Sequence, residues 1–388
     1  MAHRNTIFAQ LTTFLPRSSF DKQVRSFRGD ARVRRFPCWS QLCSMLYAQI
    51  AGSDSLRDLE TSFNAHRSSH YHLGVSEIHR STLADANEKR AWQIYMQLFH
   101  TMVNRFRALK RTNPIRISNK LCTWDSTTIQ LCLSVFDWAR FRQTKGAIKL
   151  HVHYDHGYSI PTAFVVTDGK THDVTVARRY PIEKNSILLI DRAYTDFSFL
   201  HSIHQAGAFF VTRSKSNAKY EVIERRQANR KLGITSDHII RMIGPLTRQK
   251  YPGPLRRIRY VNPEDGKVYV FLTNNFRWAA RTIARLYKCR WEVELFFKWI
   301  KQHLKIKTFL GTSFNAVMTQ ICIAMIAFLL LALIKHRAKC SLSNLDIQRR
   351  VRAALFHRMD LDHLIHGPPD QQPLAYARGQ LLLNLSLN

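Results

Sequence analysis

The chain has 388 residues, of which 59 are lysine or arginine and 27 are aspartate or glutamate, so its formal net charge is +32. A hydrophobic content of 45% is typical of a globular protein, and 14 glycines and 12 prolines exclude a collagen-like or low-complexity chain. So large an excess of positive charge indicates a polyanionic partner, either nucleic acid or an anionic membrane surface.

Seven cysteines occur at irregular spacing, and none forms a CxxC motif. An odd number with such spacing argues against both a disulfide framework and a zinc ribbon. The N-terminus has no long apolar run of the kind found in a secretory signal. We therefore expect a protein of the reducing cytoplasm.

Residues 1–112 are predicted to be a helical region that binds DNA. Apolar residues recur at helical spacing over Trp39–Ile50, a Gly-Ser-Asp turn follows, and Ser53 or Ser55 can cap a second helix. Two short helices across a tight turn fit either a DNA-reading helix-turn-helix or, more commonly, a simple helical hairpin. A longer helix is predicted from Thr82 to Lys110.

The composition changes near Pro114, and residues 113–212 are predicted to form the first part of an α/β core with a mixed sheet. The run that ends at Ile190 is apolar throughout, as in a strand buried on both faces. The predicted strands are Leu121–Trp124, Ile129–Val135, Ile148–Tyr154, Thr162–Val166, Ser186–Ile190 and Phe209–Thr212. The predicted helices are Thr171–Arg179 and Phe197–Gln205.

Residues 213–275 are predicted to be a basic, β-rich insertion into this core. Between 213 and 260 there are 13 Lys+Arg and 3 Asp+Glu, a local net charge of +10. A solvated charged surface is the alternative, but few acids are present to balance the cations. Residues 258–274 have the pattern of a β-hairpin around Pro263–Gly266.

Leu286–Leu304 contains no glycine or proline and is predicted to be one helix, within a group of core helices at residues 276–345. At about 100° per residue, four polar side chains share a stripe about 60° wide; they are Tyr287, Arg290, Glu294 and Lys301. The stripe borders the apolar face, where a cleft would lie, and Glu292 points to the other side. Either Arg290 and Glu294 form a surface ion pair, or Glu294 binds a metal ion while the cations bind phosphate.

Ala316–Ile334 carries no charge over 19 residues, which is nearly enough to cross a bilayer. The alternative is a helix buried on all sides in a large core. We favour the core helix, because the chain has one such segment and otherwise the composition of a soluble protein. Residues 346–388 are predicted to be a C-terminal tail.

Two aspartates follow apolar strands and can join Glu294 in binding metal ions. Asp125 follows the strand that ends at Trp124, and Asp191 follows the buried strand that ends at Ile190. Ligands in α/β folds gather at such strand ends. Two divalent ions about 3.5–4 Å apart can activate a water or a 3′-hydroxyl and stabilise the leaving oxygen of a phosphodiester. Taken singly, each aspartate is more commonly a turn or cap residue.

Three motifs resemble those of a known family. The spacing Y-x2-R-x3-E-x6-K matches the YREK signature of bacterial insertion-sequence transposases, the insertion sequence 4 family, at Tyr287, Arg290, Glu294 and Lys301. Thr123–Thr127 and Asp191–Tyr194 resemble the blocks that hold that family's first and second catalytic aspartates. The resemblance extends over roughly residues 115–335, and the helical region before it is similar to a small domain that often precedes this core.

The resemblance implies a DNA transposase with an RNase H-like mixed-sheet core, a β-rich insertion and a helical N-terminal domain. The implied catalytic and metal-binding residues are Asp125, Asp191 and Glu294, which would hold two Mg²⁺ ions, with Mn²⁺ as a substitute. The implied DNA contacts are Tyr287, Arg290, Trp291, Lys298 and Lys301. The implied reaction is cleavage at the ends of the element and 3′-hydroxyl strand transfer, by a homodimer in a synaptic complex with double-stranded DNA at the bacterial nucleoid.

Other motifs are less informative. His151, His153 and His156 follow one strand, but the third faces the other way, so we favour a basic sheet face over a metal site. The pair His172–Asp173 is a candidate for supporting the active site. The motif Cys38-x4-Cys43 has too few partners for zinc, and no glycine-rich loop indicates ATP or NAD.

The residues alone leave three other functions open. The first is a non-catalytic, sequence-specific DNA-binding protein or degenerate transposase that acts as a regulator and needs no metal. The second is a stand-alone nuclease, which would cut DNA without joining a 3′-hydroxyl to a target. The third is a membrane-surface protein, which carbonate extraction would detect.

Overall fold

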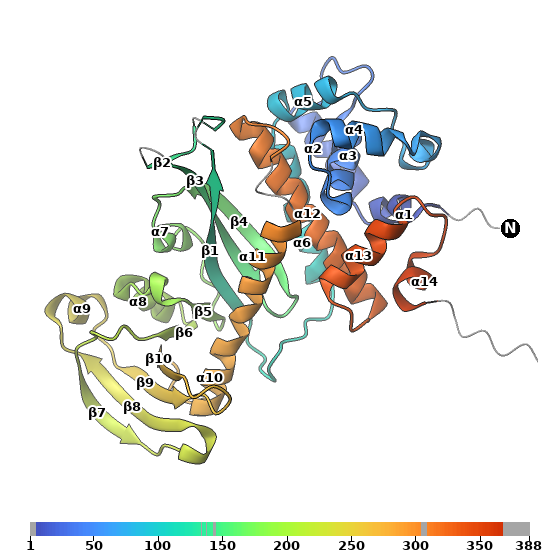
Figure 1. Cartoon of the computed structure of the whole chain (residues 1–388). Coiled ribbons are helices and arrows are strands. Elements are labelled where there is room, and N and C mark those ends of the chain that lie inside the picture. Colours follow the sequence, from blue (N-terminus) through green and yellow to red (C-terminus); the bar gives the residue numbers. More distant parts are fainter. Residues whose placement is uncertain (1–4, 133, 137, 143–144, 304–308, 368–388) are drawn as a thin grey trace, which may run out of the picture.

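Helices make up the first part of the chain in the computed structural model, which describes residues 5–132, 134–136, 138–142, 145–303 and 309–367 (Figure 1). They are α1 (Ile7–Thr13), α2 (Arg17–Ser26), α3 (Cys38–Ala51), α4 (Leu56–Asn64), the 3-10 helix η1 (Arg67–Leu73), α5 (Arg80–Lys89) and α6 (Gln93–Arg107). The last part of the predicted tail, residues 368–388, lies outside the described residues.

The helix pair predicted around Gly52 is present as α3 and α4. Gly52 follows α3 with a φ of 81°, a left-handed conformation that glycine adopts without strain. The Ser55 side chain caps α4 by accepting a hydrogen bond from the backbone N–H of Asp58. Every residue of α3 except Ala51 is buried, so its side chains are not available to DNA.

The single helix predicted from Thr82 to Lys110 is two helices, α5 and α6. Between them Arg90 has an extended backbone, with φ −80° and ψ 135°. The side-chain amide of Asn315 donates to the carbonyls of Asn87 (2.8 Å) and Arg90 (2.6 Å), which replaces helical hydrogen bonds at the break. A contact from so far along the chain leaves no mark in the local apolar pattern, and the prediction therefore missed the break.

Ten strands of the described chain join in one sheet. Its spatial order is β2-β3-β1-β5-β6-β10-β9-β8-β7, and β4 also pairs with β3. The strands are β1 (Leu121–Leu131), β2 (Arg140–Arg142), β3 (Lys145–Asp155), β4 (Ile160–Asp168), β5 (Ile187–Ile190), β6 (Phe209–Arg213), β7 (Tyr220–Arg226), β8 (Ile234–Met242), β9 (Leu255–Val261) and β10 (Val268–Thr273).

The core of this sheet has the order β4-β3-β1-β5-β6. β3 is antiparallel to both β1 and β4, whereas β1, β5 and β6 are parallel. The connections between these strands contain α7 (Asp173–Ala177), the 3-10 helix η2 (Arg192–Tyr194) and α8 (Phe197–Gln205). Three antiparallel strands followed by two parallel strands make the mixed α/β sheet of an RNase H-like core, as expected.

The strand predicted at Leu121–Trp124 and the first residues of the one predicted at Ile129–Val135 belong to one strand, β1, which ends at Leu131. Residue 133 of the second prediction lies outside the described residues. The polar stretch of β1 pairs in register with β3, from Asp125 opposite Val152 to Thr128 opposite Lys149. Asp125 therefore lies inside a strand, and the prediction that it follows the end of one was wrong. The polar residues that follow Trp124 were interpreted as a turn. In the fold they continue the strand, and Ser126, for example, donates a hydrogen bond to Asp173.

Residues 213–275 contain four strands, η3 (Arg230–Leu232) and α9 (Pro245–Lys250), and the predicted hairpin at 258–274 is β9 and β10. β10 pairs with β6, so these strands continue the core sheet, at the lower left of Figure 1. A buried ion pair between Arg256 and Asp237 (2.6 Å) joins β9 to β8.

The helix predicted over Leu286–Leu304 is divided into α10 (Ala280–Cys289) and α11 (Trp291–His303), with Arg290 between them. Its last predicted position, 304, lies outside the described residues. The two helices bury their apolar residues in different clusters. Ile283 of α10 packs with residues of β1, β5 and β6, whereas Val293 of α11 belongs to the cluster that contains α12 (Phe314–Ala338). The division at Arg290 allows one apolar pattern to serve two cores.

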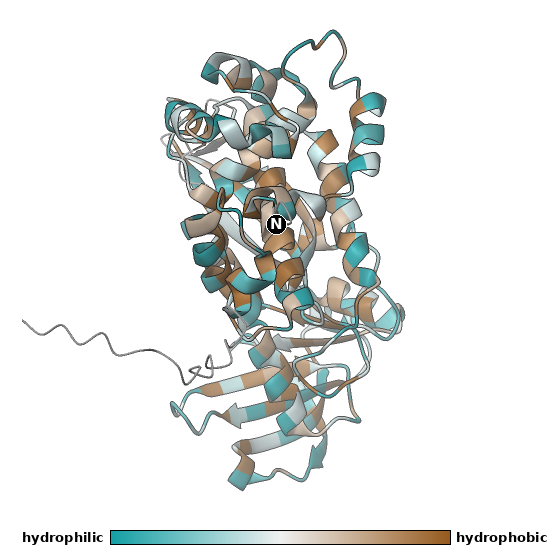
Figure 2. Cartoon of the chain, turned by 90° about the vertical axis from the view of Figure 1, so that its right-hand side faces the viewer, coloured by the Kyte–Doolittle hydropathy of each residue, from teal (hydrophilic) through white to brown (hydrophobic). Residues whose placement is uncertain are grey.

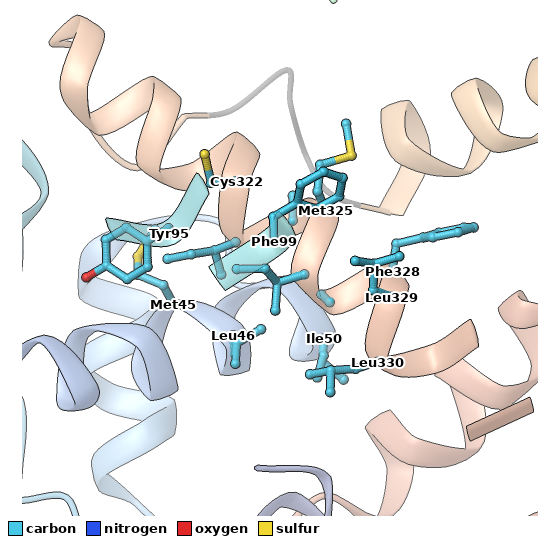
Figure 3. Packing of buried hydrophobic residues seen from close by; sticks show 14 of the residues in the cluster. Met45, Leu46, Ile50, Tyr95, Phe99, Cys322, Met325, Phe328, Leu329 and Leu330 are labelled. Atoms are coloured by element: carbon cyan, nitrogen blue, oxygen red, sulfur yellow. The ribbon is translucent and has the colours of Figure 1, made fainter. Parts of the chain in front are cut away.

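The uncharged segment 316–334 forms most of α12 and is buried over its whole length. This helix is long and apolar enough to span a membrane, yet all of its most apolar window lies inside the protein. Figure 3 shows residues of α3 and α6 packed around it, among them Met45 and Phe99. Figure 2 shows apolar ribbon gathered in the centre of the helical part and polar ribbon around it. The burial supports the core-helix interpretation.

Two further helices follow, α13 (Asn344–Ala354) and α14 (Leu361–His366), so most of the described part of the region predicted as a tail, residues 346–367, is helical. α13 packs on α3 and α12. The backbone N–H groups of Ile7 and Phe8, at the start of α1, donate to the carbonyls of His357 (3.0 Å) and Leu355 (2.8 Å). The two ends of the described chain are therefore tied together.

Candidate active site

Strand register brings Asp125 and Asp191 together. β1 and β5 are parallel neighbours in which Trp124 pairs with Ile190, so the two following aspartates lie at adjacent positions of the sheet. The hydroxyl of Tyr287, on α10, donates a long hydrogen bond of 3.5 Å to Asp191. Both aspartates thus lie where parallel strands of α/β proteins bind ligands.

Arg290 lies between α10 and α11 and bridges two carboxylates. Its Nη1 donates a 2.8 Å hydrogen bond to Asp125, and its Nη2 donates to Glu294, one turn along α11. Its Nε is buried and has no hydrogen-bond partner among the described residues. The sequence suggested the Arg290–Glu294 pair as one of two alternatives, and the fold adds Asp125 to it.

The three candidate carboxylates face one hollow of about 590 Å³, which we call the carboxylate pocket. Three cations also line it, so acidic and basic groups are equal in number. The charged lining residues are Asp125, Asp191, Glu294, Arg290, Lys298 and Lys301. The others are Ser126, Thr127, Phe297 and Gln302, which the sequence had not singled out as site residues.

Burial raises the pKa of Asp125 to about 6 from an ordinary value of 3.8, although the Arg290 guanidinium opposes the rise. The side chain is only 15% exposed, and the charges of Asp191 and Glu294 add to the effect. Removal from water thus disfavours the charged carboxylate of Asp125 more than its contact with Arg290 stabilises it. Such a site is suited to bind a further cation.

The residues of the pocket fit a divalent metal ion, because three carboxylates supply the hard oxygen donors that Mg²⁺ and Mn²⁺ prefer. In the described part of the chain no three metal-binding side chains already converge on one point. Arg290 contacts Asp125 and Glu294 instead. An ion would have to take over carboxylate oxygens that now contact this guanidinium.

The five predicted DNA contacts separate into two groups. Arg290, Lys298 and Lys301 line the carboxylate pocket. Tyr287 and Trp291 are not among the lining residues: Tyr287 is buried beneath Asp191, and Trp291 is 61% exposed. Burial raises the pKa of Tyr287 to about 12, so its hydroxyl keeps its proton.

The histidines of β3 do not form the basic sheet face that we had predicted. His151 bonds to Thr167 (2.9 Å) and His153 to Thr162 (2.6 Å). Burial lowers the pKa of His151 to about 4 and that of His153 to about 3, so both rings are neutral at pH 7. The prediction was wrong because it treated alternation along the strand as exposure.

Asp173 supports the strand that carries Asp125. It accepts a 2.6 Å hydrogen bond from the hydroxyl of Ser126, the residue after Asp125, and lies 3.3 Å from Nζ of Lys149. The sequence suggested such a role for the pair His172–Asp173. His172 itself is exposed.

A second supporting contact ties α11 to β1 and was missed in the sequence. Glu292 lies 3.2 Å from Nδ1 of His156, and Nε2 of the same ring lies 2.7 Å from the hydroxyl of Thr123. Thr123 and Asp125 are two residues apart on β1. Because 136 positions separate His156 from Glu292, no local pattern could have revealed the pair.

Comparison with known proteins identifies relatives of this chain. A family model described as a transposase DDE domain matches residues 121–330, and one described as a domain of unknown function (DUF4372) matches residues 3–76. The chain is 34% identical over 291 residues to a putative transposase, y4zB, of Sinorhizobium fredii, covering 74% of this chain and 80% of that one. It is 30% identical over 285 residues to a probable transposase for insertion sequence element IS5377 of Geobacillus stearothermophilus, covering 71% and 74%.

Among solved structures, a piggyBac transposase in a synaptic complex with hairpin DNA gives a TM-score of 0.48 at 11% sequence identity. The match covers 95% of this chain and 87% of that one. Likeness at this level supports no conclusion about this chain, and the RNase H-like assignment depends on the strand order described above.

Proposed function

Because this chain belongs to the bacterial insertion-sequence transposases with a DDE domain, enzymes that cut and join DNA with divalent metal ions, we propose that Asp125, Asp191 and Glu294 are its catalytic carboxylates. The observation that carries the proposal is that all three line the carboxylate pocket although they are far apart in the sequence. All three lie within the residues that match the DDE domain. No observation favours a regulator that lacks catalysis.

The metal ions assigned to these carboxylates are Mg²⁺, or Mn²⁺ in its place, in two sites. When bound, such ions activate the attacking hydroxyl and stabilise the leaving oxygen of the phosphodiester. The chain prepares the site: the register of β1 and β5 sets the aspartates side by side, and the Glu292–His156 contact holds the start of α11. Arg290 has to release carboxylate oxygens before an ion can take them.

Phosphates of the transposon end are the proposed partners of the pocket's cations. A guanidinium binds phosphate through paired hydrogen bonds, and Arg290 has a buried Nε that lacks a protein partner among the described residues. Lys298 and Lys301 line the same hollow, one and two turns beyond Glu294. Trp291 is exposed beside Arg290, where its ring can stack on a base. Together with Tyr287 these residues include the whole YREK-like motif.

Two copies acting together are the proposed working unit. An insertion element has two ends, and each chain supplies one set of three carboxylates. The proposed location is the bacterial cytoplasm, on the nucleoid, which is supported by seven free cysteines and a sequence pI of about 10.4. Light scattering of complexes with end DNA should give a mass of two chains and two duplexes. A complex that contains one chain would contradict the proposed two-chain working unit.

The test of the catalytic assignment uses the variants Asp125→Asn, Asp191→Asn and Glu294→Gln, which keep shape and remove charge. The substrate is a duplex that carries the inverted repeat flanking the coding region. Cleavage and 3′-hydroxyl joining should require Mg²⁺ or Mn²⁺ and fall to the metal-free level in each variant, whereas fluorescence anisotropy should show retained DNA binding.

The matched control is Glu264→Gln, which removes an exposed carboxylate of the insertion that pairs with Lys288. It should cleave like the unaltered protein. A triad variant that still cuts at the normal rate would remove its residue from the catalytic set. Cutting without joining would instead favour a nuclease.

A further inference from the structure

A second hollow lies on the N-terminal helices. It has a volume of about 550 Å³ and is lined by parts of the segment that connects α2 to α3, by α5 and by the residues that follow α5. Five cations and one carboxylate, Asp85, line it. The cations are Arg28, Arg34, Arg35, Lys89 and Arg90. We call this site the basic hollow.

Three of these arginines have no counter-ion. The side chains of Arg28, Arg34 and Arg35 are exposed and form no ion pair within the described residues. Asp85 is paired with Lys89 at 3.0 Å, and Asp30, in the connecting segment, accepts a hydrogen bond from the N–H of Cys38 at 2.7 Å. Within the described residues, neither acid forms an ion pair with Arg28, Arg34 or Arg35. Like charges that are not compensated repel one another, and an external anion relieves this repulsion.

The backbone of the connecting segment holds these charges in place. Arg28 and Arg32 have φ values of 52° and 61°, a left-handed conformation that residues other than glycine adopt only at a cost. Gly29 lies against the core, where a Cβ would come within 2.6 Å of Ile94 Cδ1 and 2.8 Å of Cys38 Sγ. The segment is thus packed tightly against Ile94 and Cys38 at Gly29. Of these two arginines, Arg28 lines the basic hollow and Arg32 does not.

The chemistry of the lining selects a phosphodiester polyanion. The planar guanidinium of arginine pairs with phosphate oxygens and stays charged at every physiological pH. Much of the remaining lining is apolar, including Ala31, Val33 and Phe36, so few groups are placed to read base edges. Duplex DNA presents one charge per about 1.7 Å of its axis, which suits a cluster of arginines that recognises charge and not sequence.

We propose that the basic hollow binds the phosphodiester backbone of duplex DNA, independently of base sequence and outside the carboxylate pocket. It takes the place of the predicted helix-turn-helix as the DNA contact of the N-terminal region. α3 is buried in the core, and α4 exposes Arg57 next to Asp58, a mixed pair of charges. The hollow thus provides a DNA-binding site that is separate from the reacting phosphate.

The test is equilibrium binding of the full-length protein to two fluorescent duplexes, one with the end sequence and one of random sequence, in EDTA over a series of salt concentrations. The test variant is Arg34→Gln/Arg35→Gln, whose exposed positions predict an unchanged fold. The control is Arg57→Gln/Arg80→Gln, which removes the same charge from exposed positions of α4 and α5 outside the hollow. Thermal unfolding checks both variants, and Arg34→Gln alone decides if the double variant is less stable.

In the test variant the slope of log K against log salt should fall by about two, one unit for each lost phosphate contact, and in the control by less than one. The single variant should lose about one unit. Affinity for both duplexes should fall by the same factor. An unchanged slope, an equal change in the control, or a loss confined to the end sequence would each overturn the proposal. Binding is measured without divalent ions, so no outcome depends on whether the three carboxylates are catalytic.

Discussion

The carboxylate pocket and the basic hollow use the same kinds of side chain in opposite ways. In the pocket three carboxylates face three cations, and Arg290 is paired with two of the acids, whereas in the hollow five cations face one acid. The pocket can exchange one cation for another, but the hollow can be neutralised only by an anion from outside. The net charge of +32 is thus unevenly placed: the pocket is balanced and the hollow is not.

α12 packs on α5, which lines the hollow, and on α11, which carries Glu294. The largest effect should come from weakening its contact with α11. Phe328 is buried and packs edge-on against Phe296 and Trp299, with ring centres 4.9 and 5.0 Å apart. Phe328→Ala should lower the free energy of unfolding by about 3–5 kcal/mol. It should also reduce cleavage more than DNA affinity, because α11 carries Glu294. Urea unfolding and an end-cleavage assay measure the two effects. Phe314→Ala, on the same helix but 45% exposed, should cost less than half as much, and equal costs would contradict this account.

A smaller effect should distinguish the buried acid of the pocket from the exposed acid of the hollow. Because the pKa of Asp125 is about 6 when folded and about 3.8 when unfolded, the folded state favours the protonated form. Stability is therefore lost as pH rises from about 4 to about 6 and stays lower above that. Asp125→Asn should raise the free energy of unfolding at pH 8 by up to about 3 kcal/mol, and the gain should vanish near pH 4. Asp85→Asn should change it by less than about 0.5 kcal/mol at either pH. The measurement is urea unfolding in EDTA. If Asp125→Asn were less stable than the unaltered protein at pH 8, a raised pKa of Asp125 would be refuted.

Exchange of cations in the pocket can be measured directly. If Arg290 holds the carboxylates until a phosphate takes its guanidinium, Arg290→Gln without DNA should bind Mn²⁺ about tenfold more tightly than the unaltered protein, as seen by calorimetry. Adding end DNA should tighten Mn²⁺ binding in the unaltered protein but not in the variant, and Mn²⁺ should tighten DNA binding by the same factor. Lys298→Gln removes the same charge from the same pocket without touching the Arg290 contacts, and its effect should be much smaller. If Arg290→Gln and Lys298→Gln increased Mn²⁺ affinity equally, the cause would be the loss of one positive charge and not the release of carboxylates by Arg290.

The smallest effect should be that of salt on the chemical step. Raising salt from 50 to 200 mM should lower DNA affinity by several powers of ten if six or more phosphates are contacted. With DNA saturating, the cleavage rate should change by less than about threefold, because partly buried ion pairs are screened weakly. Single-turnover rates at both salt concentrations test this. A rate that falls in parallel with affinity would place salt-sensitive charges in the chemical step as well.

Most elements of the fold could be predicted because their apolar patterns are local. The buried strand β5, the helices α3 and α8 and the hairpin of β9 and β10 all carry their own signal. Three errors in the predicted elements share one cause, which is a partner far along the chain. Asn315 breaks the helix predicted over 82–110, and Asp173 satisfies Ser126 inside a strand that had been predicted to end there. Burial from two clusters divides α10 from α11.

The candidate site was predictable to the extent that its residues belong to motifs. Asp125, Asp191 and Glu294 were chosen from strand ends, a helical stripe and a family resemblance, and they do face one hollow. The bridge from Arg290 to Asp125 could not be inferred, because it depends on how α11 crosses β1. The same limit applies to the His156–Glu292 contact. The basic hollow was missed because its arginines lie in a loop, where residue spacing does not predict direction.

The burial of residues 316–334 of α12 has a consequence for the synthesis of the protein. The ribosome produces α3 and α6 long before it reaches residue 314, so apolar side chains such as Leu46 and Phe99 lack their contacts with α12 until most of the chain has emerged. A copy interrupted earlier, by a frameshift or a stop codon, would leave these side chains exposed and be prone to aggregation or proteolysis. Damaged copies of this gene should therefore leave no lasting DNA-binding fragment to compete with intact protein.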